Sequence, residues 1–223
     1  MLKLDLHIHS HYSDDAVGTP KEIIKSVQKK GLHGCAITDH NCLTGSLQAV
    51  KEAPKDFIVV PGLEISTDDG HLLAYNITQP VERHLSLEET VEQIIQLGGI
   101  PVVPHLYRNL SGIGDQKLPR IIKSIPALEI FNSCSLPKTN VNIARVARQY
   151  NVGGTGGSDS HDPHYAGYGY TTVDTTDCTF DTILQEIIKK KTWAEGVTMP
   201  LSYRRDRMAT SIKQYVKRGF RRI

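Results

Sequence analysis

The histidines and acids of this chain fall where predicted β-strands end, and this placement restricts the fold more than any other feature. Apolar and polar residues alternate from residue 2 to residue 9, which is the period of a strand and puts His7 and His9 on one face. The polar residues at or just past predicted strand ends are His7, His9, Asp39, His40, Glu64, His105, Asn132, Asp159 and His161. One His-x-His pair also occurs on ordinary solvated strands, but a solvated surface would not collect its histidines only at strand ends. The pattern indicates a metal site.

The order of the predicted elements indicates an α/β fold. Helices are predicted at residues 21–30, 43–51, 87–97, 141–150 and 180–190, and strands at residues 2–8, 35–38, 57–60, 100–103, 127–131, 152–157 and 170–173. Residues 65–77 are predicted to form a hairpin with Asp69-Gly70 as its turn. Strands that alternate with helices imply parallel βαβ units, and in barrels of such units the carboxyl ends of the strands carry the active site.

Length and composition restrict the number of domains and the cellular compartment of the protein. The chain has 223 residues and a net charge of +2, and no Ser/Gly/Pro-rich linker divides it. We therefore expect one domain at residues 1–200 and a C-terminal segment at residues 201–223. The four cysteines form no CxxC pair, and the sequence has neither a signal peptide pattern nor an apolar run of about 18 residues. These features predict a cytoplasmic protein without a transmembrane segment.

The C-terminal segment differs in charge from the rest of the chain. Residues 201–223 contain eight Lys or Arg and one Asp, so the segment carries +7 and the remainder −5. Five residues in it recur at helical spacing and predict a basic amphipathic helix: Ile212, Tyr215, Val216, Gly219 and Phe220. Three interpretations stay open, namely a helix docked on the barrel, a surface for nucleic acid or another polyanion, and a helix at a membrane surface.

Several motifs, in this order along the chain, resemble those of a known family. They are His7-x-His9 with Asp14, Thr38-Asp39-His40, Pro61-Gly62-Leu63-Glu64, His105, Leu128-Glu129-Ile130-Phe131-Asn132 and Gly157-Ser158-Asp159-Ser160-His161. Together they resemble the PHP family, the polymerase and histidinol phosphatase superfamily of metal-dependent phosphoesterases. The resemblance runs from Asp5 to about Gly169.

The resemblance implies a distorted, TIM-like (β/α)7 barrel that holds two or three divalent ions of Mn, Zn or Fe; the basic C-terminal helix predicted from helical spacing would follow this barrel. By position, one ion is expected at His7, His9, Glu64 and Asp159. Glu64 would bridge to a second ion at His71 and His105, and a third would lie at Asp14, His40 and His161. The family often has Pro and then Arg after the position of His105; here Leu106 replaces the Pro, and Arg108 is the expected contact to substrate phosphate.

These residue types suit phosphate ester hydrolysis. Imidazoles and carboxylates together select Mn, Zn or Fe, whereas an all-oxygen set would suit Mg or Ca. Two ions about 3.5–4 Å apart can clamp a phosphate and activate a water molecule as hydroxide. We therefore expect catalytic roles for Glu64, His105, His161 and Arg108, with His71 or His161 able to protonate the leaving group where it holds no ion. Asp39 is expected to orient a neighbour or to cap a turn.

Three functions are compatible with this site. The leading hypothesis is hydrolysis of small phosphomonoesters, with nucleotide-type substrates favoured. The second is a 3′-end nuclease on DNA or RNA whose strand is held by the basic tail, with binding that weakens steeply in salt. The third is a catalytically silent PHP subunit that binds nucleic acid, which the complete set of predicted ligands speaks against.

Overall fold

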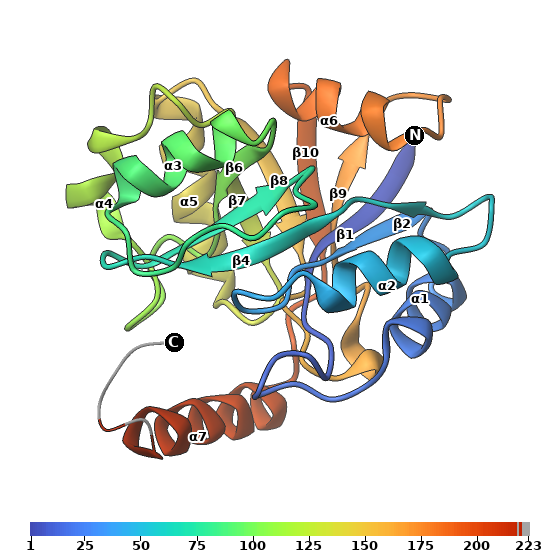
Figure 1. Cartoon of the computed structure of the whole chain (residues 1–223), viewed down its shortest axis with the longest axis horizontal. Coiled ribbons are helices and arrows are strands. Elements are labelled where there is room, and N and C mark those ends of the chain that lie inside the picture. Colours follow the sequence, from blue (N-terminus) through green and yellow to red (C-terminus); the bar gives the residue numbers. More distant parts are fainter. Residues whose placement is uncertain (218, 220–223) are drawn as a thin grey trace.

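The computed structural model describes residues 1–217 and 219, and its centre is a ten-stranded mixed sheet that curls into a half-barrel (Figure 1). The strands are β1 (Leu2–Ile8), β2 (Gly34–Ile37), β3 (Ile58–Val59), β4 (Gly62–Ser66), β5 (His71–Tyr75), β6 (Ile100–Val103), β7 (Ala127–Asn132), β8 (Gly153–Gly157), β9 (Gly169–Val173) and β10 (Thr192–Gly196). The helices are α1 (Pro20–Lys29), α2 (Thr44–Glu52), α3 (Leu87–Gln96), α4 (Gly114–Lys117), α5 (Pro137–Gln149), α6 (Phe180–Ile188) and α7 (Leu201–Lys217), with short 3₁₀ turns at Leu118–Arg120 and Pro163–Tyr165. The predicted PHP-type fold and its C-terminal helix are confirmed. Among the described residues, no helix is both long and apolar enough to cross a membrane.

The strand directions differ from an all-parallel barrel at two places. The hydrogen-bonded order is β3-β2-β1-β9-β8-β7-β6-β5-β4, with β10 paired to β9. β5 runs antiparallel to both neighbours, and β9 runs antiparallel to β1, β8 and β10. The tight turn between β4 and β5 forces the reversal there, because a parallel pair needs a crossover of a dozen or more residues. The hairpin predicted at residues 65–77 is thus present, whereas β10 was not predicted from the sequence.

A short backbone contact joins the two edges of the curled sheet, at β2 and β4. Asn41, in the loop after β2, donates its N–H to the carbonyl of Glu64 (2.8 Å), and the Glu64 N–H reaches the carbonyl of Asp39 (3.2 Å). His40 and Glu64 form an isolated parallel bridge at this point. Because of this contact, the carboxyl end of β4 lies beside the carboxyl end of β1 and its histidines.

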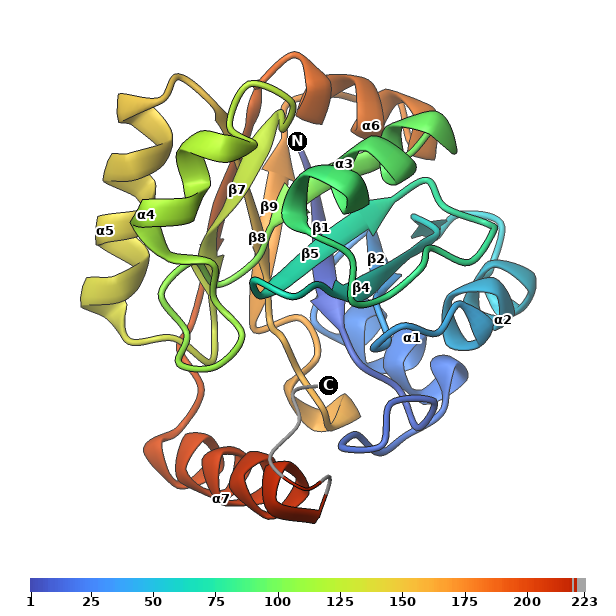
Figure 2. The same cartoon turned by 60° about the vertical axis from the view of Figure 1, so that its left-hand side comes forward.

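The two ends of the half-barrel have opposite character. Leu4, Leu6 and Val102 belong to one buried cluster with Ile183 and Ile187 of α6, so apolar side chains fill the end where β1 begins. Figures 1 and 2 show α6 at that end and α7 at the opposite end of the sheet. The buried histidines and acids lie at the carboxyl ends of the strands, facing the side of α7.

Strand β8 is almost free of side-chain bulk, and this allows β1 to approach it closely. A Cβ atom added at Gly157 would lie 2.3 Å from Cβ of His7 and 2.7 Å from its backbone nitrogen. Gly157, the last residue of β8, therefore serves close strand packing at the site itself.

We predict that Gly157→Ala lowers the free energy of unfolding by about 1–3 kcal/mol, because the added methyl group must displace backbone atoms of His7. Urea unfolding of the metal-free protein measures this change. Gly153→Ala, on the same strand, is the matched control and should cost less, since its added Cβ would meet Lys190 Cα at 3.0 Å. Equal losses in the two variants would contradict the role of the His7 contact.

Candidate metal centre

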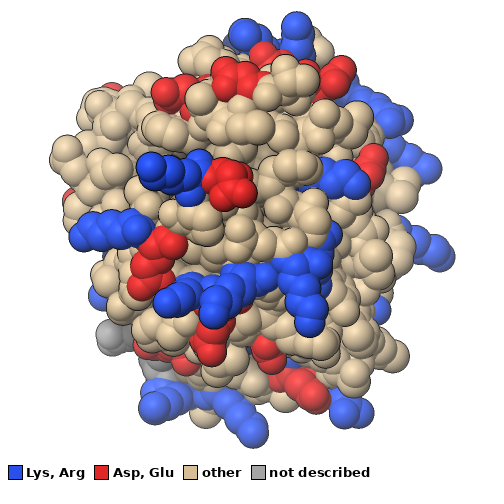
Figure 3. All heavy atoms as spheres, turned by 90° about the vertical axis from the view of Figure 1, so that its right-hand side faces the viewer, with Lys and Arg blue, Asp and Glu red and all other residues tan. Residues whose placement is uncertain are grey.

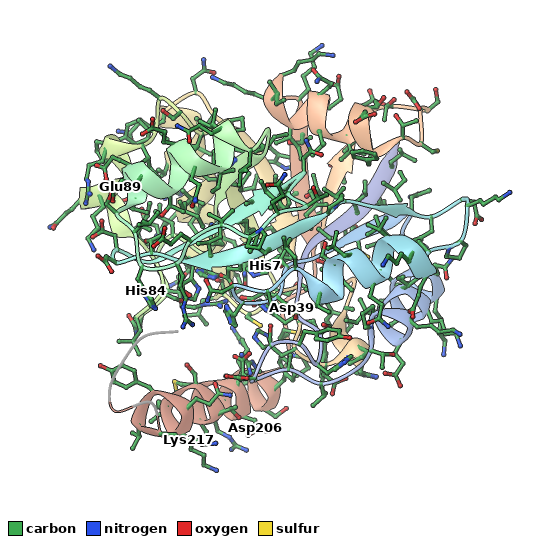
Figure 4. All side chains as sticks on the ribbon, in the orientation of Figure 1. His7, Asp39, His84, Glu89, Asp206 and Lys217 are labelled. Carbon is green, nitrogen blue, oxygen red and sulfur yellow. The ribbon has the colours of Figure 1, made fainter. Side chains whose placement is uncertain are left out.

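The buried polar residues at this end of the half-barrel form one continuous cluster. His7 comes from β1, Glu64 from the middle of β4 and His71 from the first position of the antiparallel β5, while the others follow β1, β2, β6 and β8. Figure 4 shows His7 inside the molecule, far from the labelled surface residue Glu89. Four overlapping groups have ligand atoms within 4.8 Å of one another: His9–His40–His161, His7–His105–Asp159, His7–His9–Glu64 and His40–Glu64–His71. The structure thus brings together eight of the nine predicted metal ligands.

Glu64 lies at the centre of the cluster. Its Oε1 is 2.9 Å from both His71 Nδ1 and His105 Nε2. Its Oε2 lies 3.1 Å from His40 Nδ1, 3.3 Å from His9 Nε2 and 3.5 Å from His7 Nε2. Burial alone would raise the pKa of this carboxyl group, but the surrounding imidazoles hold it well below its usual value. The two oxygens therefore face two different sets of imidazoles, as a bridging carboxylate would.

The two carboxylate oxygens of Asp159 have different partners: one faces the histidines, and the other contacts Arg108 and Asn132. Oδ1 lies 3.5 Å from His9 Nε2 and 3.7 Å from His7 Nε2. Oδ2 pairs with the guanidinium of Arg108 and accepts a hydrogen bond from Asn132 Nδ2 at 3.0 Å. Asn132 also accepts from Arg108 at 3.2 Å. Arg108 is thereby fixed against the metal-site carboxylate, with its side chain 31% exposed.

Several buried atoms of the cluster lack hydrogen bonds within the described part of the chain. They are Asp15 Oδ1, His40 Nδ1, His105 Nδ1, Asp159 Oδ1 and His161 Nε2. Buried polar atoms without partners are uncommon in folded proteins, because their desolvation is not compensated. A convergent set of unpaired imidazole nitrogens and carboxylate oxygens fits divalent ions, and the mixture of nitrogen and oxygen donors suits Mn, Zn or Fe.

Asp15, and not the predicted ligand Asp14, faces the third group of histidines. The Asp15 side chain is only 4% exposed, and its Oδ2 lies 3.2 Å from His161 Nε2. Its Oδ1 lies 3.9 Å from His40 Nε2. Asp14 is exposed. Both acids lie in a turn closed by the Ala16 N–H to Ser13 carbonyl hydrogen bond, and in a turn the sequence spacing does not show which of two adjacent side chains faces inward.

Further buried residues orient the rings of His7 and His9. Glu129 Oε1 lies 2.9 Å from His7 Nδ1, and the other Glu129 oxygen accepts from the backbone N–H of His105 at 2.8 Å. Ser13 Oγ lies 3.2 Å from His9 Nδ1 and donates to Asp39 at 2.8 Å. With Nδ1 occupied in this way, both rings turn Nε2 inward, which is the arrangement that metal-binding histidines usually show. Asp39 is therefore an orienting residue, as expected, whereas the role of Ser13 was missed.

The histidines divide into two classes by pKa. Burial opposes protonation of His9, but hydrogen bonds with Asp159 and Glu64 outweigh it and raise the pKa to about 9. The pKa of His7 also lies well above the usual value, because Asp159, Glu129 and Glu64 outweigh its burial. Burial lowers the pKa of His161 to about 4 and that of His40 well below its ordinary value. In the protein without metal, the neighbouring acids therefore favour the protonated form of His7 and His9, whereas burial favours the neutral form of His40 and His161.

The comparison with family models agrees with this geometry. The model of the PHP domain matches residues 5–111, and the model of the PHP-associated region matches residues 137–192. The chain belongs to the PHP domain family. It is a PHP-family phosphoesterase with buried His, Glu and Asp clusters.

Two curated proteins are similar to this chain over more than half of its length. An uncharacterized protein of Methanocaldococcus jannaschii is 34% identical over 145 residues, 59% of this chain and 82% of the relative. A 3′,5′-nucleoside bisphosphate phosphatase of Chromobacterium violaceum is 32% identical over 130 residues, which are 58% of this chain but only 39% of that enzyme.

Solved structures show the same fold at low identity. A two-domain protein of Bacteroides vulgatus containing a predicted PHP-like metal-dependent phosphoesterase superposes with a TM-score of 0.76 at 17% identity, covering 88% of this chain and 65% of that one. The lesion-specific endonuclease Q of Pyrococcus furiosus superposes with a TM-score of 0.63 at 20% identity, covering 84% and 56%.

We predict that loading the PHP centre with Mn²⁺ at pH 7 releases protons. The raised pKa values of His7 and His9 mean that bound protons must leave before the nitrogens can bind an ion, so Mn²⁺ affinity should fall as the pH decreases below about 9. Calorimetric titrations in buffers of different ionisation enthalpy measure the number released. His84→Asn, at an exposed position, should behave as wild type, whereas His9→Asn should release fewer protons. A buffer-independent enthalpy would contradict this prediction.

We also predict that Asp15→Asn lowers the number of bound Mn²⁺ ions by one, since it removes the carboxylate between His40 and His161. Elemental analysis of dialysed protein measures the stoichiometry. Asp14→Asn is the matched control, because it makes the same change one residue earlier at an exposed position. Loss of an ion from the Asp14 variant instead would show that Asp14 is the ligand.

Proposed function

We propose that this protein hydrolyses phosphomonoesters of small, nucleotide-type molecules with the help of two or three divalent ions. The observation that carries the proposal is a single cavity of about 90 Å³ that unites the metal cluster with a fixed arginine. His40, His71, Asp159 and His161 line it together with Arg108. A phosphoryl group in this cavity would contact both a guanidinium and the candidate ligands.

The residues divide into three proposed ligand sets. His7, His9, Glu64 and Asp159 would hold one ion, and Glu64 would share a second with His71 and His105. Asp15 takes the place expected for Asp14 in the third set, with His40 and His161. Bound divalent ions would supply Lewis-acid activation of water and of the phosphoryl group.

Arg108 is the proposed phosphate contact. Its planar guanidinium offers parallel N–H donors to phosphate oxygens, and Asp159 and Asn132 fix its orientation before substrate arrives. The Leu106 that replaces the Pro common in the family is fully buried, so this exchange leaves Arg108 at the cavity.

His161 suits a ligand role better than that of a proton donor. Its pKa of about 4, caused by burial, leaves it neutral at pH 7. A neutral imidazole has a lone pair for a metal ion but a poor proton to give to a leaving group. The proposed catalytic roles of Glu64, His105 and His161 are therefore to hold ions, and that of Arg108 is to bind the phosphoryl group.

Two observations favour small phosphorylated molecules over nucleic-acid strands as substrates. The nucleoside bisphosphate phosphatase shares 32% identity with this chain, and helix α7 borders the cavity. A nuclease is the alternative, supported by the endonuclease Q fold similarity and by basic side chains on another face of the molecule. Figure 3 shows a band of Lys and Arg across the face that carries α1 and α2, with acidic side chains above and below it.

Phosphate release by the manganese-loaded protein tests the proposal. The panel contains nucleoside monophosphates, nucleoside 3′,5′-bisphosphates, sugar phosphates, and single-stranded DNA and RNA oligonucleotides. We expect release from the nucleotides without shortening of the oligonucleotides. Shortened oligonucleotides would favour the nuclease, and no turnover despite bound metal would favour the silent binding subunit.

We predict that Glu64→Gln lowers kcat/KM at least 1,000-fold, or about 4 kcal/mol of transition-state stabilisation, and removes bound metal together with activity. Glu82→Gln, the same change at an exposed position, should leave both unchanged. Full activity in the Glu64 variant would rule out the proposed mechanism.

A further inference from the structure

Helix α7 lies outside the sheet but contacts the loops that carry the metal cluster. Tyr203 Oη accepts a hydrogen bond from the backbone N–H of His161 at 3.0 Å. Gln214 donates to the carbonyl of Asp14 at 3.2 Å, and Arg204 donates to the carbonyl of Ser135 at 3.4 Å. Figures 1 and 2 both show the helix across the end of the half-barrel where the strands terminate.

The hydrogen bonds of α7 to these loops come from its polar side chains. Of the predicted apolar face, Tyr215 lines the cavity, whereas Ile212 and Val216 are about half exposed. Phe220, the last residue of that predicted face, lies outside the described residues, as do Arg218, Arg221 and Arg222. Figure 4 shows the labelled Asp206 and Lys217 directed away from the half-barrel. The basic side chains of α7 are therefore not equivalent, and one of them is directed to the site.

Arg207 is that basic side chain. It donates from one terminal nitrogen to the carbonyl of Asp15 and from the other to Asp15 Oδ2, both at 2.9 Å. Its side chain is 19% exposed, and it lines the same cavity as Arg108 and the histidines. Ser211 and Tyr215, on the next turns of α7, also line this cavity. The helix thus forms part of the cavity wall.

Two guanidinium groups consequently border one small cavity. Arg108 belongs to the segment after β6, and Arg207 belongs to α7, so they approach from different elements. Each is paired with one carboxylate of the metal cluster, Asp159 or Asp15. A guanidinium has five N–H donors, and the hydrogen bonds of Arg207 to described residues use one from each terminal nitrogen. Further donors are available to a bound anion.

We propose that Arg207 is a specificity-determining residue that binds a second anionic group of a small substrate, while Arg108 binds the phosphoryl group that is hydrolysed. The inference rests on the proposed phosphatase function. A substrate with one phosphate would use Arg108 alone, and a substrate with an additional phosphate or carboxylate would use both arginines. The preferred substrate class is therefore small molecules that carry two anionic groups.

The position of α7 also sets the size of the substrate. The cavity of about 90 Å³ is smaller than an engineered cavity of about 150 Å³ that holds benzene, so it accommodates a phosphoryl group but not a nucleoside. The rest of a substrate must extend outward past Arg207 and the segment of residues 108–111. A terminal phosphate suits a cavity of this size, and α7, which lines it with Arg207, Ser211 and Tyr215, narrows the space for a nucleic-acid strand that continues on both sides of the phosphate.

Calorimetric binding of two non-hydrolysable probes to the manganese-loaded protein tests the role of Arg207. Methylphosphonate carries one anionic group, and phosphonoacetate carries a phosphonate and a carboxylate. We expect wild type to bind phosphonoacetate more tightly than methylphosphonate. Arg207→Gln should weaken the affinity for phosphonoacetate about tenfold or more, and should change the affinity for methylphosphonate less than about twofold. In turnover, the same variant should raise KM for a nucleoside bisphosphate and leave its kcat near the wild-type value.

Arg205→Gln is the matched control, because Arg205 lies on the same helix with its side chain 75% exposed and pairs with Asp206. It removes the same charge and should leave the preference between the probes unchanged. Arg207→Lys retains a cation and should retain part of the preference; circular dichroism and metal content verify that each variant is folded and loaded. An unchanged preference in Arg207→Gln, or an equal loss in Arg205→Gln, would overturn the proposal. Absence of turnover in wild type would instead refute the proposed function, while the probe binding would still decide the role of Arg207.

Discussion

The structure depends on one buried carboxylate that is shared by several imidazoles. Glu64 keeps its negative charge in a site with almost no solvent because His7, His9, His40, His71 and His105 surround its two oxygens. An isolated buried carboxylate would be strongly destabilising, so these residues form one electrostatic unit. The backbone of Glu64 has a second task, since its N–H and carbonyl join the loop after β2 to β4. Closure of the half-barrel and assembly of the site therefore depend on the same residue.

This coupling explains how a chain of short strands collects ligands from distant positions. The apolar cluster around Leu4, Leu6 and α6 packs the opposite end and supplies hydrophobic stabilisation that does not involve the polar residues. Gly157 in β8 lets β1 approach, Glu129 holds the ring of His7, and Asp39 holds the ring of His9 through Ser13. The ligand atoms are thus positioned by backbone packing first and by hydrogen bonds second.

Most of this arrangement could be predicted from the sequence, for a physical reason. Strand periodicity and the position of polar residues at strand ends are local properties, so the fold class and the gathering of His7, His9, His40, Glu64, His105, Asp159 and His161 followed from them. Inward orientation in a turn is not local, and Asp14 was expected where Asp15 lies. The contacts of Tyr203 and Arg207 join residues more than 40 positions apart in sequence, so the local sequence around either residue cannot predict these contacts. Helical spacing in α7 indicated its apolar stripe, yet the helix docks through polar side chains.

The separation between the sheet and α7 has an evolutionary consequence. The candidate ligands all come from strands and the loops that follow them, whereas Arg207, Ser211 and Tyr215 belong to an element added after the last strand. Changes at Ser211 or Tyr215 would alter the cavity wall. Changes at Tyr203 or Arg207 would also reach His161 and Asp15, so substrate range can vary independently of the ligands only on the part of α7 that follows Arg207.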